Sequence, residues 1–252
     1  MKTWSYDPAR DLDQSLVERL RGFPREPDML VYGARLCSAA LIRAWLSLYH
    51  RFRVLGRENL PADGSFVLVA NHASHLDALC LLAALRARDL HRAFPAAAQD
   101  YFFVSVPRVM LSAVVVNALP FDRRIEPRRS LAICRHMLER RSILLLFPEG
   151  TRSVTGDLAE FKHGIGFILA GTDHPVLPCY LEGSHRAWPK SAWFPRPRRV
   201  RLTIGKPRSY ANLQPSKESA LHIARELKAA VQDLAEFTRS GREDDPTQET
   251  AR

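Results

Sequence analysis

A histidine and an aspartate five residues apart, His72 and Asp77, form the first candidate site of this 252-residue chain. They follow an apolar run, residues 66–70, that predicts a buried strand ending just before the histidine. Across a strand-to-helix turn the aspartate can fold back and accept a hydrogen bond from one ring nitrogen. The ring is then held in one tautomer, and its second nitrogen can take a proton from an alcohol. A cap that only stabilises the turn would use the same pair, so the spacing by itself leaves both roles open.

Two other chemistries would use residues of the same part of the chain. A metal site built from His72, His75 and Asp77 is disfavoured, because the usual hydrolase arrangement needs a histidine after the aspartate and the next position is alanine. A serine nucleophile, Ser74 or Ser184, is disfavoured because the chain has no G-x-S-x-G elbow. General-base chemistry is the interpretation that these residues favour.

A second polar segment follows a continuous apolar run that ends at Phe147. The run predicts a strand buried on both faces, and the Pro-Glu-Gly sequence after it predicts a sharp turn. Gly150 allows a ligand to approach the backbone closely, and arginine and lysine match the geometry of a phosphate. A phosphate site here would draw its donors from Thr151, Arg152, Ser153 and Lys162, with Arg123 further upstream. A well-capped loop with a surface arginine is the alternative.

The charge of the chain agrees with an anionic partner. The net charge is +10 and the pI is about 9.9. The excess lies on the body of the chain, since residues 61–208 hold 21 Lys and Arg against 12 Asp and Glu. Such a body attracts lipid headgroups, phosphate-bearing small molecules or nucleic acid. The sequence has no helix-turn-helix pattern and no basic strand with interleaved aromatic residues, so we expect no nucleic-acid partner.

The elements that must position these residues alternate between strands and helices, which predicts an α/β fold with a mixed central sheet flanked by helices. The expected strands cover residues 52–56, 66–70, 92–98, 142–148, 175–181 and 199–205. The expected helices cover residues 29–51, 75–87, 106–116, 126–140, 163–171 and 216–238, the last of them amphipathic. Four scattered cysteines are expected to be buried free thiols: Cys37, Cys80, Cys134 and Cys179.

The N-terminal helix, residues 29–51, is apolar over most of its circumference. Arg35 and Arg43 are eight positions apart and share one side, opposite Leu, Ile, Ala and Trp residues. This pattern is typical of a helix in a membrane interface, with Trp45 and Tyr49 as belt residues, although packing on the domain's own core would also explain it. The sequence contains no uncharged apolar stretch of 18 residues, so we expect no spanning helix. We also expect no signal peptide.

Taken together, these segments resemble the glycerolipid acyltransferase family, whose best-known members convert lysophosphatidate to phosphatidate. The family's first motif, N-H-x-S-x-x-D, matches Asn71 to Asp77. Its third motif, F-P-E-G-T-R-S, matches Phe147 to Ser153 without a gap, and the F-K-x-G continuation matches residues 161–164. Its fourth motif, an apolar pair before proline, matches residues 176–178.

The family's second motif, roughly G-x-[IF]-x-[IF]-x-R, matches this chain only in part. Phe121 and Arg123 fit the pattern, but Asn117 stands where glycine is usual, and residues 118–120 are atypical. This departure concerns the identity of the acceptor more than the reaction.

The resemblance implies a role for each matching position. His72 would deprotonate the acceptor hydroxyl and Asp77 would orient it, and the oxygen would attack the thioester of acyl-CoA or acyl-carrier protein without a covalent acyl-enzyme. The acceptor phosphate would be held by Arg123, Glu149, Gly150, Thr151, Arg152 and Lys162. Acyl-CoA or acyl-carrier protein is a co-substrate, and the chemistry needs no metal and no bound cofactor.

The expected function is therefore acyl transfer to a lysophosphatidate-like acceptor in phospholipid biosynthesis. A lyso-aminolipid, glycerol-3-phosphate or another lysophospholipid as acceptor, or a non-catalytic lipid-binding protein, are the alternatives. We expect a membrane-associating helical segment at 1–51, an acyltransferase domain at 52–238 and a polar disordered tail at 239–252. The expected location is the cytoplasmic face of the inner cell membrane, peripheral or monotopic, on anionic lipids. Residues 186–199 are either a membrane-touching loop or a basic hairpin connection.

Overall fold

A seven-stranded sheet forms the centre of the molecule in the computed structural model, which describes residues 29–98, 119–121 and 127–240. Its strands are β1 (Arg53–Leu55), β2 (Phe66–Ala70), β3 (Ala93–Ala98), β4 (Leu119–Phe121), β5 (Ile143–Leu146), β6 (Val176–Glu182) and β7 (Arg201–Ile204). Their order across the sheet is β1-β7-β6-β2-β5-β3-β4. All neighbours are parallel except β6 and β7, so the sheet is mixed, as expected.

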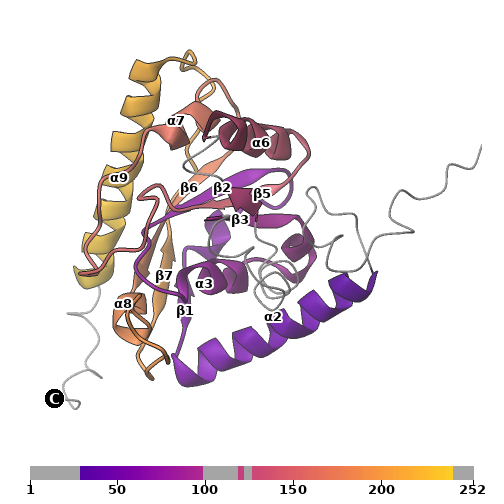
Figure 1. The fold of residues 1–252 in the computed structure, drawn as a ribbon, viewed down its shortest axis with the longest axis vertical. Coiled ribbons are helices and arrows are strands. Elements are labelled where there is room, and N and C mark those ends of the chain that lie inside the picture. The colour runs from indigo at the N-terminus through magenta and orange to yellow at the C-terminus, as the bar shows by residue number, and fades with distance from the viewer. Residues whose placement is uncertain (1–28, 99–118, 122–126, 241–252) are drawn as a thin grey trace, which may run out of the picture.

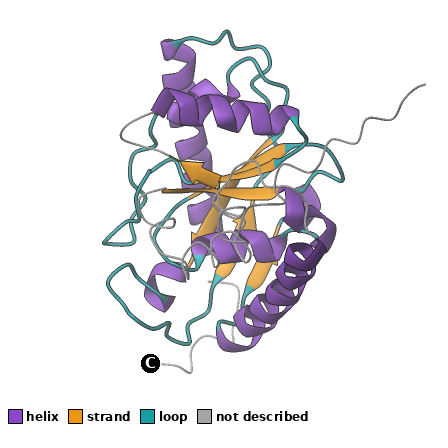
Figure 2. Cartoon of the chain, turned by 45° about the vertical axis from the view of Figure 1, so that its right-hand side comes forward, coloured by secondary structure: helices purple, strands orange, loops and turns teal. Residues whose placement is uncertain are grey.

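Helices cover both faces of this sheet (Figures 1 and 2). The described helices are α2 (Met29–Tyr49), α3 (Asp77–Ala84), α6 (Pro127–Glu139), α7 (Gly164–Leu169), α8 (Ser184–Ala187) and α9 (Lys217–Ser240), with short 3-10 turns η1 (Arg57–Asn59) and η2 (Ala87–Arg92). Side chains of β2 alternate between two cores. Phe66, Leu68 and Ala70 pack with α2 and α3, whereas Val67 and Val69 pack with α6, α7 and α9.

The α/β class expected from the sequence is confirmed. It could be predicted because the residues within single strands already indicate burial on both faces. Strands β2 and β5 are wholly apolar and buried on both faces, as parallel strands between two helix layers must be. The sequence predicts no strand at residues 119–121, whereas the structure pairs β4 with β3 there in parallel. The helix expected at 106–116 lies outside the described residues.

Three loops meet at one edge of the sheet. The central strand β2 lies between β5 and β6 and is parallel to both. The carboxyl ends of parallel neighbours point the same way, so the segments that follow residues 70, 146 and 182 emerge side by side. This edge is where open α/β sheets place their ligand sites.

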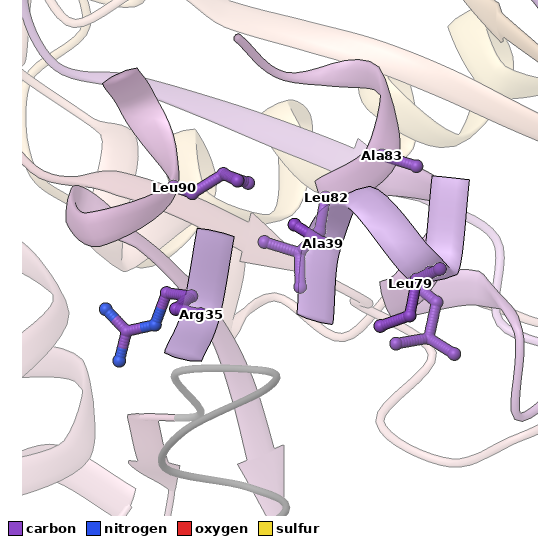
Figure 3. A pocket seen from close by; sticks show the side chains of 7 residues that line it. Arg35, Ala39, Leu79, Leu82, Ala83 and Leu90 are labelled. Carbon is purple, nitrogen blue, oxygen red and sulfur yellow. The ribbon is translucent and has the colours of Figure 1, made fainter. Parts of the chain in front are cut away.

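Helix α2 lies along the outside of the domain, against α3 and η2 (Figure 1). Its arginines face inward: Arg35 is buried, and Arg43 donates hydrogen bonds to the carbonyl oxygens of Ala83 (3.2 Å) and Leu85 (2.6 Å). These bonds satisfy carbonyls at the C-terminal end of α3. Trp45 is partly buried and packs against the core, as the core-packing alternative predicts. A small, largely apolar pocket remains beside Arg35, lined by residues of α2, α3 and η2 (Figure 3).

The opposite side of α2 is exposed and carries no charge. We call it the outer face; it consists of Ala34, Cys37, Ala40, Leu41, Ala44, Ser47 and Leu48. Leu41 and Leu48 are 72% and 82% exposed. Cys37 is therefore not buried as expected, while Cys80, Cys134 and Cys179 are. Among the described residues, no helix is both long and apolar enough to cross a bilayer.

Candidate active site

The segment that follows β2 brings His72 and Asp77 together. His72 Nδ1 lies 2.8 Å from Asp77 Oδ2, and the aspartate is fully buried while the histidine side chain is 19% exposed. The same carboxylate oxygen accepts hydrogen bonds from the backbone N–H groups of Ala73 (2.7 Å) and Ser74 (2.8 Å). Three donors thus fix the aspartate in place. With Nδ1–H donating to the carboxylate, Nε2 of His72 is left as the nitrogen that can accept a proton.

The loop after β5 packs directly on the histidine. The ring of Phe147 stacks on the ring of His72, with centroids 4.2 Å apart and planes 20° apart. The backbone N–H of Ser153 donates to the carbonyl oxygen of His72 at 2.7 Å. The two motifs, 77 residues apart in the chain at His72 and Glu149, are therefore parts of one site.

Glu149 joins these two motifs rather than facing a ligand. Its Oε1 accepts a hydrogen bond from the backbone N–H of His72 at 2.6 Å, and its Oε2 accepts one from Ala159 at 3.1 Å. The residue is 4% exposed, and burial raises the pKa of its carboxyl group against the effect of the two hydrogen bonds. Glu149 is a positioning residue, which corrects the expectation that it would hold the acceptor phosphate.

The absence of a side chain at Gly150 leaves room for the Lys162 side chain beside the turn. The glycine has φ of 75°, and its N–H donates to the carbonyl oxygen of Phe147. A Cβ atom at this position would lie 2.7 Å from Nζ of Lys162, so a larger residue would push the ammonium group away. The backbone N–H of Lys162 donates to Pro148, which ties the FKHG segment to the turn. The exposed lysine side chain is thus available to an anion next to the loop.

Arg152 reaches across the site to His75. Its Nη1 lies 2.5 Å from Nδ1 and 2.7 Å from Nε2 of His75. Burial, followed by the positive charge of Arg152, lowers the pKa of His75, so the ring is held neutral and can accept from the guanidinium. This contact also removes His75 from the metal alternative, because a ring nitrogen facing a guanidinium is not presented to a cation. Sequence reasoning missed His75 as the residue that positions Arg152.

The third loop, after β6, supports the histidine turn from the other side. Ser74 Oγ donates to the carbonyl oxygen of Trp188 at 2.7 Å, and the backbone N–H of His75 donates to the same oxygen at 3.3 Å. Asn71 exchanges two hydrogen bonds with the backbone of Leu181, which extends the pairing of β2 with β6. No sequence pattern predicts this contact of Trp188, since nothing local links it to residues more than a hundred positions upstream.

The structure therefore gathers most of the expected site residues at one sheet edge. His72, Asp77, Gly150, Arg152 and Lys162 lie there, and Thr151 is exposed on the same loop. Arg123 lies outside the described residues. The described part of the chain contains no group of three His, Cys, Asp or Glu side chains arranged to hold a metal ion. What remains is an oriented imidazole next to cationic side chains, which suits proton removal from a phosphate-bearing alcohol.

Comparisons with known proteins agree with this arrangement. A model of the family described as Acyltransferase matches residues 51–182, just over half of the chain. The chain is 31% identical over 157 residues to the 1-acyl-sn-glycerol-3-phosphate acyltransferase LPAT1, chloroplastic, of Arabidopsis thaliana, covering 59% of this chain and 42% of that protein. It thus spans about two fifths of the length of this relative and of a similar one from Brassica napus.

Two bacterial proteins are similar over more of their length. A 1-acyl-sn-glycerol-3-phosphate acyltransferase of Bacillus subtilis (strain 168) is 26% identical over 202 residues, covering 79% of this chain and 96% of that protein. The crystal structure of the 1-acyl-sn-glycerophosphate acyltransferase PlsC from Thermotoga maritima superposes with a TM-score of 0.63 at 24% identity, over 87% of each chain. The latter likeness shows that the two chains share a fold.

Proposed function

Because this chain belongs to the acyltransferase family, we propose that it is an O-acyltransferase that works at a membrane surface. It moves a fatty acyl chain from acyl-CoA or acyl-carrier protein to the free hydroxyl of a 1-acylglycerol-3-phosphate-like acceptor in glycerolipid synthesis. Residues 52–238 carry the reaction and residues 1–51 attach the protein to the lipid. The observation that carries the proposal is the 2.8 Å contact between His72 Nδ1 and the buried carboxylate of Asp77.

The proposed reaction follows from that contact. The acceptor O–H bond breaks as its proton moves to Nε2 of His72, and the oxygen forms a bond to the thioester carbonyl carbon. The carbon–sulfur bond then breaks, and the leaving thiolate takes the proton from the imidazolium. The negative charge of Asp77 stabilises the imidazolium while it exists. The products are an ester and a free thiol, and the histidine is returned to its starting state.

Arg152 and Lys162 supply the charge that recognises the acceptor. They lie on the loop that packs against His72, and a guanidinium and an ammonium both suit a phosphate. A hydroxyl next to that phosphate, as in a glycerol backbone, can then reach Nε2 of His72. When the phosphate is bound, the acceptor hydroxyl is held at a fixed position relative to the base. Less entropy is then lost on reaching the transition state.

The proposal is tested by thiol release with one acyl-CoA and a panel of acceptors. We expect the highest kcat/KM with 1-acylglycerol-3-phosphate. Removing its phosphate, as in a monoacylglycerol, is expected to lower kcat/KM by about 100-fold or more, since a bound phosphate accepts several charge-assisted hydrogen bonds. Thiol release that is equal with and without the acceptor phosphate would contradict the proposal, and no release with any member of the panel would favour a non-catalytic lipid-binding protein.

Membrane attachment is proposed for the outer face of α2. This face presents two exposed leucines and no charge over the length of the helix, whereas both arginines of the helix point into the domain. Beside its C-terminal end lies a loop with Trp193 and Phe194, 89% and 79% exposed. Tyr49 Oη donates to the carbonyl oxygen of Pro195 at 3.1 Å and so joins helix and loop. Apolar side chains next to basic ones suit the interface of an anionic bilayer, here the cytoplasmic face of the inner membrane.

Replacing Leu41 and Leu48 together by glutamine is expected to weaken binding to anionic lipid vesicles by about tenfold or more, because two apolar side chains lose their place in the bilayer interface. Sedimentation with phosphatidylglycerol-containing vesicles measures the bound fraction. Phe237→Gln is the matched control, since it removes an exposed apolar side chain from α9. An equal loss in the control, or no loss in the double variant, would contradict the assignment of this face.

A further inference from the structure

A hollow lined by arginine is formed by α8 and the loop that follows it, at the same sheet edge as His72. Its volume is about 450 Å³, and it is lined by His185, Arg186, Pro189, Arg196 and Arg198. We call it the arginine hollow. The loop that forms it is closed by its own backbone, since the N–H of Arg196 donates to the carbonyl oxygen of Ala187 at 2.7 Å. Trp188 Nε1 donates to Ala192 at 3.0 Å inside the same loop. The hollow therefore has a defined wall.

Within the described ranges, the three arginines of the hollow have no carboxylate as a partner. In the described part of the chain no carboxylate lies within ion-pair distance of Arg186, Arg196 or Arg198, although other surface arginines, such as Arg92 and Arg208, have such partners. Prolines at 195 and 197 alternate with Arg196 and Arg198 and favour an extended backbone. Residues two apart on an extended chain point to the same side, so both guanidinium groups line the hollow. A space of this size lined by three guanidinium groups that pair with no described carboxylate is suited to phosphate.

The hollow is one layer of residues away from the catalytic histidine. On one side, His185 Nε2 lies 3.0 Å from the carbonyl oxygen of Val154, and the neighbouring Ser153 donates to His72. On the other side, Trp188 lies between Arg186 and Pro189 of the hollow and accepts hydrogen bonds from Ser74 and His75. A phosphate bound here would not reach the histidine, but a flexible arm attached to it would.

The phosphate site next to the histidine is already assigned to the acceptor, through Arg152 and Lys162. The second substrate of the proposed function also carries phosphate, because both acyl-CoA and acyl-carrier protein hold the acyl thioester on a phosphopantetheine arm. We propose that the arginine hollow binds the phosphate groups of this donor, with the pantetheine arm running past Trp188 to place the thioester at His72. This inference rests on the proposed function, since it assigns the second substrate of the same site.

The test compares donors that differ only in phosphate, using the full chain. In Arg196→Gln/Arg198→Gln, KM for palmitoyl-CoA is expected to rise by about tenfold or more with little change in kcat, because charge-assisted hydrogen bonds to the bound donor are lost. KM for S-palmitoyl-pantetheine, which has the same thioester and no phosphate, is expected to stay unchanged. Arg199→Gln is the matched control, since Arg199 is exposed next to Arg198 but does not line the hollow.

The other outcomes separate the sources of phosphate. A rise with palmitoyl-CoA alone assigns the hollow to the nucleotide phosphates of CoA, and a rise that includes palmitoyl-carrier protein assigns it to the phosphate that both donors share. Both results support the proposal. An equal rise for palmitoyl-pantetheine, a rise only in KM for the acceptor, or a loss confined to vesicle binding would overturn it, the last result pointing to lipid headgroups.

A binding measurement keeps the inference separate from the proposed function. Free CoA is titrated into the protein and the heat of binding recorded, with no turnover required. The double variant is expected to raise the Kd of CoA by about tenfold or more, and Arg199→Gln is expected to leave it unchanged. In one outcome the native chain binds CoA and transfers no acyl group, while the double variant binds CoA more weakly. In that case the proposed function fails and the assignment of the hollow to CoA is kept. If the Kd of CoA is unchanged in the double variant, the hollow is not the donor phosphate site, whatever the acyl-transfer activity.

Discussion

Alanine in place of His72 is expected to lower kcat for acyl transfer by about 1,000-fold or more, because the acceptor hydroxyl loses the base that takes its proton. The fold should be retained, since the imidazole is partly exposed and its carbonyl and N–H partners on the backbone remain. Steady-state thiol release gives kcat, and a thermal melt verifies that the variant is folded.

The matched control is His222→Ala, which makes the same change at an exposed position on α9. Its kcat is expected to equal that of the native chain. KM for the acceptor in His72→Ala should change little, because the phosphate is held by other side chains. A folded His72→Ala protein that transfers acyl groups at close to the native rate would remove the mechanism.

The second large effect is expected at Asp77, where charge and hydrogen bonding can be separated. All three donors to this side chain, His72, Ala73 and Ser74, bond to the one oxygen Oδ2. An asparagine oxygen in that place can keep the three bonds but not the negative charge. We therefore expect Asp77→Asn to fold and to lose about 100-fold or more in kcat, since the imidazolium that forms during transfer is no longer stabilised.

Asp77→Ala provides the contrast. It removes the acceptor as well as the charge and leaves two buried backbone N–H groups without their partner. We expect it to lower the free energy of unfolding by about 2 kcal/mol or more, which urea denaturation measures. If Asp77→Asn kept the native kcat, the carboxylate would be a structural cap and its charge would have no part in the reaction. If Asp77→Ala were as stable as Asp77→Asn, the amide hydrogen bonds would contribute little.

Glu149 and Arg152 show how the third motif contacts the segment that carries His72. Both carboxylate oxygens of Glu149 accept hydrogen bonds from backbone N–H groups, one of which is the N–H of His72. Arg152 is held in place by His75, three residues after His72. The motif that sequence reasoning assigned wholly to phosphate binding therefore has two tasks. Its carboxylate holds the backbone of His72, and we propose that its cations bind the acceptor phosphate.

Helix α2 illustrates a pattern that periodicity alone could not orient. The sequence placed Arg35 and Arg43 on one side of an apolar helix, which fits either a membrane interface or a protein core. In the structure the arginine side faces the domain, because Arg43 satisfies carbonyls at the end of α3. The apolar residues of the helix fall into two groups. Residues such as Trp45 pack toward the domain, whereas the outer face with Leu41 and Leu48 is exposed.

Features that depend on neighbours within a few residues can be predicted from the order of residues alone. The apolar runs of β2 and β5 specify buried strands, and the five-residue spacing of His72 and Asp77 lets a single turn close the hydrogen bond between them. Such contacts cost little chain entropy, because the residues that make them are already close. The family motifs are also short and contiguous, so they could be recognised without a structure.

Which of these segments meet is set by packing across the whole domain. Any apolar strand can pair with any other, and the choice of β5 and β6 as the neighbours of β2 follows from how all the helices pack. That choice sets Phe147 against His72, directs the Glu149 carboxylate to the backbone N–H of His72 and brings Trp188 with the arginine hollow to the same edge. These contacts join residues 75 to more than 110 positions apart, and they depend on packing free energies that no local pattern of residues encodes.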